Sequence, residues 1–154
     1  MGWPLRILGT CVLCLLVTGL SGPSFAQQPK IKVYVRATTP DSVGKTLVYN
    51  IREQINSSSR YELAATESDA SFQFRIATLD PGESTSSRST VYSAVLTGTQ
   101  IVSPHATVYL NHWVGTCGVS VAASCAENLF ADVDTEVAPV LESVLVSRVS
   151  TRKK

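Results

Sequence analysis

The chain has 154 residues, with 13 Lys and Arg against 12 Asp and Glu and a formal charge of +1. A chain of this length forms one domain with one core, and it buries roughly two thirds of its unfolded surface. The near-neutral charge argues against nucleic acid as a partner, because a protein that neutralises several phosphates needs an excess of basic side chains.

The first 26 residues have the pattern of a cleavable export signal. Arg6 precedes an apolar run from Ile7 to Leu20, and Ser24-Phe25-Ala26 provides a small-residue cleavage site. The apolar run is shorter than the ~20 residues that a membrane-spanning helix needs. We expect cleavage after Ala26 and a mature chain without a transmembrane segment, located in the periplasm or secreted.

The mature chain is expected to consist of one secreted domain, 27–148, and a basic tail, 149–154. Arg6 leaves with the signal, so acids and cations are equal in number in the remainder. The last residues are rich in Arg and Lys, and a run of this kind at a chain end is typical of a solvated terminus.

The cysteines also indicate an oxidising compartment. Cys11 and Cys14 lie in the signal, which leaves Cys117 and Cys125 as an isolated pair. We predict a disulfide between them. A zinc site that combines this pair with His112 is the weaker interpretation, and we expect no metal and no cofactor.

The first half of the domain predicts a strand, a helix and two further strands. Apolar and polar residues alternate from Lys30 to Arg36, as in a half-buried strand. Thr39-Pro40-Asp41 has the chemistry of a helix start, and apolar residues recur at helical spacing to about Asn56. A short strand is expected at Tyr61–Ala65, and regular alternation predicts a longer strand at Ala70–Leu79.

The second half predicts two strands and a long helix. Asp80-Pro81-Gly82 and a polar loop from Glu83 to Ser89 precede a strand at Thr90–Thr97. The last strand alternates Val108, Leu110, His112 and Val114 with Tyr109, Asn111 and Trp113. A helical period begins at Ala126, and Pro139 inside it should kink or split the helix.

These elements predict an α+β fold in the order strand, helix, four strands, helix. The connections are short enough for antiparallel neighbours, so we expect a mixed, mostly antiparallel sheet with both helices packed on one face. The side chains expected to face the helices are Ile31, Val33, Val35, Phe72, Phe74, Ile76, Val108 and Leu110.

No motif identifies a reaction, and we predict no catalytic residue. Gly44-Lys45-Thr46 lacks the first glycine of a phosphate-binding P-loop. His105 or His112 could serve a small secreted hydrolase, but no Gly-x-Ser-x-Gly motif accompanies them. The acids of residues 132–136 lie in a helical pattern and lack the glycine of a calcium loop.

The polar side of the strands is the candidate binding face. We expect it to carry Tyr34, Arg36, Arg75, Tyr109 and Trp113, and aromatic residues with arginine are enriched at protein interfaces. The competing interpretation is that exposed cross-strand aromatics only stabilise the sheet.

The order of elements, with Glu67-Ser68-Asp69-Ala70-Ser71 leading into Phe72-Gln73-Phe74-Arg75-Ile76, resembles the small α/β domains of bacterial envelope proteins. Examples are the amino-terminal domain of the TolB translocation protein and the accessory domains of curli-secretion and penicillin-binding-protein-activator lipoproteins. The resemblance implies a non-enzymatic module that binds another envelope or extracellular protein. A small secreted hydrolase, or an extracellular inhibitor or effector that presents the Glu83 to Ser89 loop, remains the alternative.

Overall fold

The computed structural model describes residues 30–82, 88–99 and 106–151, with side chains to residue 140. The principal elements are β1 (Ile31–Thr38), α1 (Ser42–Ser57), β2 (Tyr61–Leu63), β3 (Phe72–Leu79), β4 (Ser89–Thr99), β5 (Thr107–Gly118) and α2 (Ala122–Thr151). Single 3₁₀ turns lie at Glu67–Asp69 and Val119–Val121. The expected α+β order is therefore confirmed.

The five strands form one sheet in the order β2-β1-β3-β4-β5. β1 pairs in parallel with both β2 and β3, whereas β3 with β4 and β4 with β5 are antiparallel. The sheet is thus mixed, as expected, but its parallel and antiparallel pairs are equal in number. β2 and β3 follow each other in sequence, yet β1 lies between them in the sheet. The short connection between β2 and β3 therefore does not make them antiparallel neighbours.

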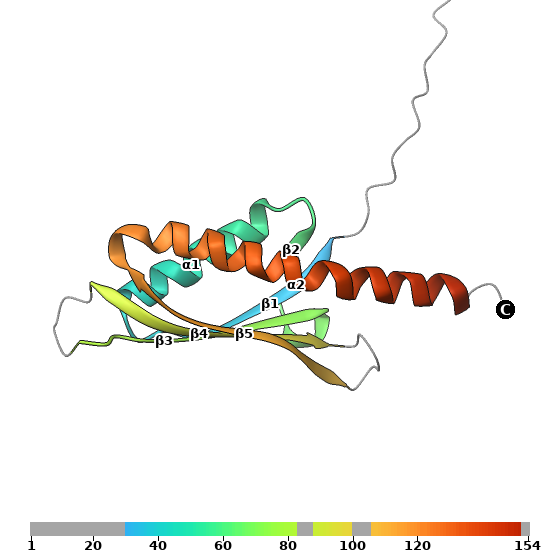
Figure 1. Ribbon diagram of the computed structural model, residues 1–154, viewed down its shortest axis with the longest axis horizontal. Coiled ribbons are helices and arrows are strands. Elements are labelled where there is room, and N and C mark those ends of the chain that lie inside the picture. The colour runs from blue at the N-terminus through green and yellow to red at the C-terminus, as the bar shows by residue number, and fades with distance from the viewer. Residues whose placement is uncertain (1–29, 83–87, 100–105, 152–154) are drawn as a thin grey trace, which may run out of the picture.

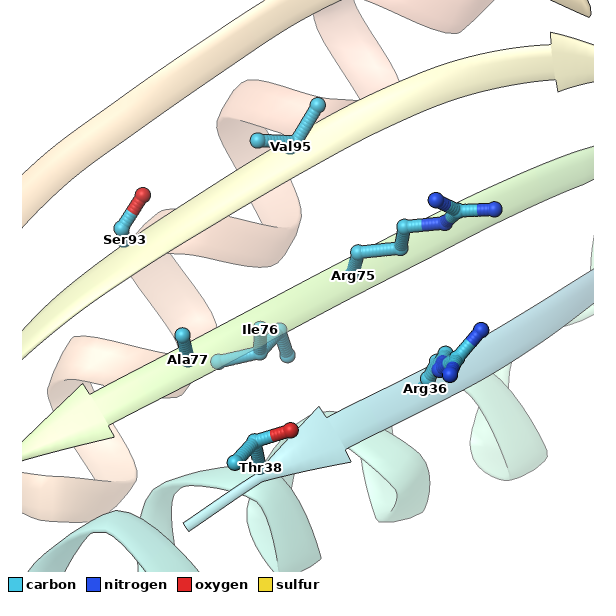
Figure 2. Close-up of a pocket in the computed structure, with 7 residues that line it drawn as sticks. All are labelled: Arg36, Thr38, Arg75, Ile76, Ala77, Ser93 and Val95. Atoms are coloured by element: carbon cyan, nitrogen blue, oxygen red, sulfur yellow. The ribbon is translucent and has the colours of Figure 1, made fainter.

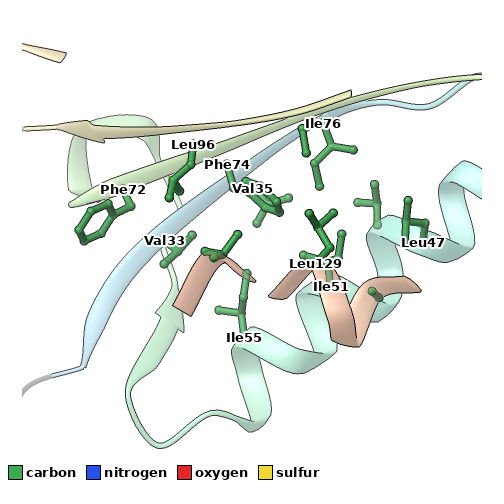
Figure 3. Packing of buried hydrophobic residues seen from close by; sticks show 14 of the residues in the cluster. Val33, Val35, Leu47, Ile51, Ile55, Phe72, Phe74, Ile76, Leu96 and Leu129 are labelled. Carbon is green, nitrogen blue, oxygen red and sulfur yellow. The ribbon is translucent and has the colours of Figure 1, made fainter. Parts of the chain in front are cut away.

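Both helices cover the same face of the sheet (Figure 1). The apolar side of α1 supplies Leu47, Ile51 and Ile55, which are buried against Val33, Val35 and the aromatic rings of β3. α2 closes the core next to α1 with Ala126, Leu129, Val133 and Val137. Figure 3 shows Leu129 close to Ile51 of α1, between the helices and the sheet. Neither described helix lies over the opposite face of the sheet, which is called the helix-free face below.

The long helix continues through Pro139. α2 is unbroken from Ala122 to Thr151, so the split considered for this position does not occur. Proline removes a single amide donor, and long helical segments lie on both sides of it, so the helix is maintained. In Figure 1 the carboxyl-terminal part of α2 extends beyond the sheet.

A β-bulge in β5 changes which residues face the helices. Leu96 of β4 pairs with Asn111 and Thr97 pairs with Tyr109, so Leu110 is the extra residue. One inserted residue reverses the alternation of the strand beyond it. The unbroken alternation expected from Val108 to Val114 is therefore wrong, and His112 and Val114 lie on the helix-free face with their β4 partners.

The predicted disulfide is confirmed. Cys117 at the end of β5 is bonded to Cys125 in the first turns of α2, with Cα atoms 6.2 Å apart. Cys117 is buried in the core cluster and Cys125 packs against it. The bond closes the connection between the last strand and the long helix.

Candidate functional site

The helix-free face of the sheet consists of cross-strand rows. One row runs Tyr34, Gln73, Thr97 and Tyr109, and the next runs Arg36, Arg75, Val95 and His112. A third row runs Thr38, Ala77, Ser93 and Val114. Tyr109 is 58% exposed and Val114 is 68% exposed. This face therefore combines cationic, aromatic and apolar side chains.

Arg36 and Arg75 place two positive charges next to each other on the helix-free face. They are direct partners in the parallel register of β1 and β3. Both line a shallow hollow of about 220 Å³ with Thr38, Ala77, Ser93 and Val95. Figure 2 shows the two guanidinium side chains lying side by side along the strands, with the helices behind the sheet. The hollow offers two planar cations and two hydroxyl groups to a ligand.

The two arginines differ in how they are held. Arg75 Nη2 donates to Gln73 Oε1 at 3.0 Å and to Glu67 Oε1 at 3.1 Å, which fixes its orientation. Arg36 is exposed and forms no ion pair with any described residue. Like charges opposite each other in a sheet are destabilising. The carboxylate of Glu67 offsets the charge of Arg75, whereas no described carboxylate offsets the charge of Arg36.

The predicted binding residues do not all lie on this face. Tyr34, Arg36, Arg75 and Tyr109 do, but Trp113 does not. Trp113 lies opposite Ala94 on the helix-covered side and packs edge-to-face on Phe74, with ring centroids 6.1 Å apart. The bulge at Leu110 causes the difference, so the assignment of Trp113 to the polar side is corrected.

Of the two histidines, the structure describes His112. Tyr109 Oη and His112 Nδ1 are 2.5 Å apart on the helix-free face, where both side chains are exposed. His105 and most of the Glu83 to Ser89 loop lie outside the described residues, as does the export signal. No set of three or more His, Cys, Asp or Glu side chains that could hold a metal ion occurs among the described residues.

A buried polar cluster joins α1 to the sheet, and sequence reasoning found only part of it. Asp41 caps α1, because its Oδ1 accepts from the Gly44 amide at 2.5 Å. Its Oδ2 accepts from Thr78 Oγ1 at 2.6 Å and from Thr90 Oγ1 at 3.1 Å. Burial opposes ionisation, but these hydrogen bonds outweigh it and lower the pKa of Asp41. Gly44 is required here, because a Cβ would lie 2.7 Å from Thr78 Cβ and from Asp41 Oδ2.

A second polar cluster joins β2 to α2. Tyr61 is buried and donates its hydroxyl hydrogen to Asp134, which also forms an ion pair with Arg60 at 2.8 Å. Burial, together with the hydrogen bond to Asp134, raises the pKa of Tyr61 to about 12. This cluster attaches the edge strand to the helix layer.

We expect the contribution of Tyr61 to the free energy of unfolding to decrease at alkaline pH. The folded-state pKa is raised above the unfolded value of about 10, so the contribution is complete below pH ~10 and is lost as the pH rises toward 12. In urea unfolding at a series of pH values, Tyr61→Phe should therefore flatten the decline of stability over this interval. Tyr49→Phe, at an exposed position on α1, should leave the decline unchanged. Equal profiles for wild type and Tyr61→Phe would contradict the assignment.

Comparison with known proteins gives distant structural matches. No protein-family model matches the chain, and no curated protein matches it significantly. The hypothetical protein CT253 from Chlamydia trachomatis is 11% identical, with a TM-score of 0.39 over 57% of this chain and 72% of that one. Protein XCC0632 from Xanthomonas campestris, of the family DUF330, is 10% identical, with a TM-score of 0.40 over 85% of this chain and 93% of that one. Neither of these two proteins is described as a TolB or penicillin-binding-protein-activator domain.

Proposed function

We propose that this protein is an exported, non-enzymatic accessory domain of the bacterial cell envelope that binds another envelope or extracellular protein. The expected export signal and the disulfide support a location outside the cytoplasm. Among the described residues, no helix is both long and apolar enough to cross a membrane. The resemblance to TolB-like accessory domains points to binding rather than catalysis.

The observation that carries the proposal is the pair Arg36 and Arg75 on the helix-free face. Arginine forms strong, bidentate hydrogen bonds with carboxylates and is enriched at interface centres. Among the described residues, Glu62 lies 4.0 Å from Lys32, and Glu67 pairs with Arg75, so these carboxylates already have a cation. The surplus charge is that of Arg36. The partner surface therefore presents an Asp or Glu side chain to the arginine hollow and apolar groups to Tyr109 and Val114.

Arg36→Glu should weaken partner binding at least tenfold, because it replaces the unpaired cation with a carboxylate. The test is chromatography of an envelope extract on immobilised protein, with retained proteins quantified by mass spectrometry. Lys45→Glu is the matched control, because it makes the same charge change at an exposed position on α1. A protein retained by wild type and Lys45→Glu but lost with Arg36→Glu is the expected result. An identical set of proteins on all three columns would rule out this face as the binding surface.

A further inference from the structure

The two edges of the sheet are very different. β2 forms one edge with 3 residues, and β5 forms the other with 12. β4 is the single described neighbour of β5, so the outer amide and carbonyl groups of β5 are paired with no described strand. A long edge strand of this kind is a template for the pairing of another strand.

β5 lacks the usual features that prevent edge pairing. It contains no Lys, Arg, Asp, Glu or Pro between Thr107 and Gly118. Natural edge strands are protected by charges, by proline, by short length or by a covering segment. β5 instead exposes Val114 on the helix-free face, where a polar residue is usual. Its one protective feature is the bulge at Leu110.

The bulge defines the part of β5 that can receive a strand. From Asn111 to Gly118 the pairing with β4 is regular. His112, Val114 and Thr116 face the helix-free side in this segment, and Trp113 faces the helix side. An added strand over these residues would extend both faces of the sheet without a break.

We propose that the segment 111–118 of β5 pairs antiparallel with the same segment of a second copy of this chain, which joins two sheets into one. A symmetric antiparallel pairing places residue i opposite residue j of the other copy and residue j opposite residue i, so a charged residue close to the two-fold axis would lie next to its own like charge. The segment 111–118 has no such residue, and His112 is its one titratable side chain apart from the bonded Cys117.

The dimer should be weak. One pair of strands buries an area at the low end of specific interfaces, so association should depend on concentration in the micromolar range. This inference does not rest on the proposed function, because it uses the edge of the sheet and not the arginine hollow on its face.

Sedimentation velocity over about a hundredfold range of protein concentration tests the proposal. We expect a reversible monomer–dimer equilibrium in the wild type and a dissociation constant at least tenfold higher in Val114→Lys. Leu79→Lys is the matched control: Leu79 is 64% exposed on the same face but at the end of the inner strand β3, so the equilibrium should not change. Thr116→Lys provides a second edge variant if Val114→Lys does not fold.

The position of Trp113 provides an independent spectroscopic measurement. The chain has 2 tryptophans, and Trp3 lies in the expected export signal, so Trp113 is the sole reporter in the mature chain and in a Trp3→Phe variant of the full chain. Its emission should shift to shorter wavelength as dimer forms. A monomer at all concentrations would overturn the proposal, as would a dimer that tolerates Val114→Lys and Thr116→Lys, or one that Leu79→Lys dissociates equally.

Discussion

Replacing Asp41 by alanine should lower the free energy of unfolding by about 3 kcal/mol, from the loss of a helix cap and of two hydrogen bonds to a buried carboxylate. The carboxylate satisfies the Gly44 amide and the hydroxyl groups of Thr78 and Thr90. Alanine would leave the Gly44 amide and the Thr78 hydroxyl without this acceptor, whereas Thr90 Oγ1 also lies 3.3 Å from the carbonyl oxygen of Leu79. Because the donors come from α1, β3 and β4, the substitution should loosen the attachment of the helix layer to the sheet.

The measurement is urea unfolding of Asp41→Ala, Asp41→Asn and the control Asp132→Ala, which removes an exposed acid from α2. The folded-state pKa of Asp41 is lowered, so its stabilisation is present above the unfolded pKa of about 4 and is lost as the pH falls through the folded value. The deficit of Asp41→Asn relative to wild type should therefore shrink in acid. A deficit independent of pH would show that the charge of Asp41 contributes nothing.

Trp113→Ala should lower the free energy of unfolding by about 3 kcal/mol, whereas Tyr109→Ala should lower it by less than about 1 kcal/mol. Trp113 packs on Phe74 at the border of the core, so its removal leaves a cavity. Tyr109 is exposed on the helix-free face. Thermal and urea unfolding of the two variants give the comparison directly. A stable Trp113→Ala protein with a destabilised Tyr109→Ala protein would contradict the described register of β5.

A comparison of β1 and β3 with β5 shows where sequence reasoning succeeds and where it fails. In β1 and β3 the alternation is regular, so Arg36 and Arg75 were placed on the polar face correctly. In β5 the sequence alternates Val108, Leu110 and Val114 with other residues as if the strand were regular. No residue type shows that Leu110 is an inserted residue. Pairing with β4 decides the register there, and pairing is a long-range property.

The contacts of Asp41 and the pairing of Arg36 with Arg75 could be predicted from the sequence only in part, because they too depend on long-range contacts. The helix start at Asp41 could be predicted from neighbouring residues, because capping is local. Its contacts with Thr78 and Thr90 join residues that are 37 and 49 positions away, and no local pattern connects them. The direct pairing of Arg36 with Arg75 likewise requires β1 to lie between β2 and β3, which the lengths of the connections did not indicate.

The disulfide restricts how two copies of this chain could exchange parts. Domain swapping of α2 would require the connection after β5 to open as a hinge, so that the helix could leave its own sheet and cover the other. Cys117 and Cys125 close that connection covalently and tie the edge strand to the start of the helix. In the oxidised protein the segment cannot straighten fully into a hinge, and exchange of α2 is therefore disfavoured. Reduction would remove this kinetic protection, and entangled oligomers should then accumulate on prolonged incubation.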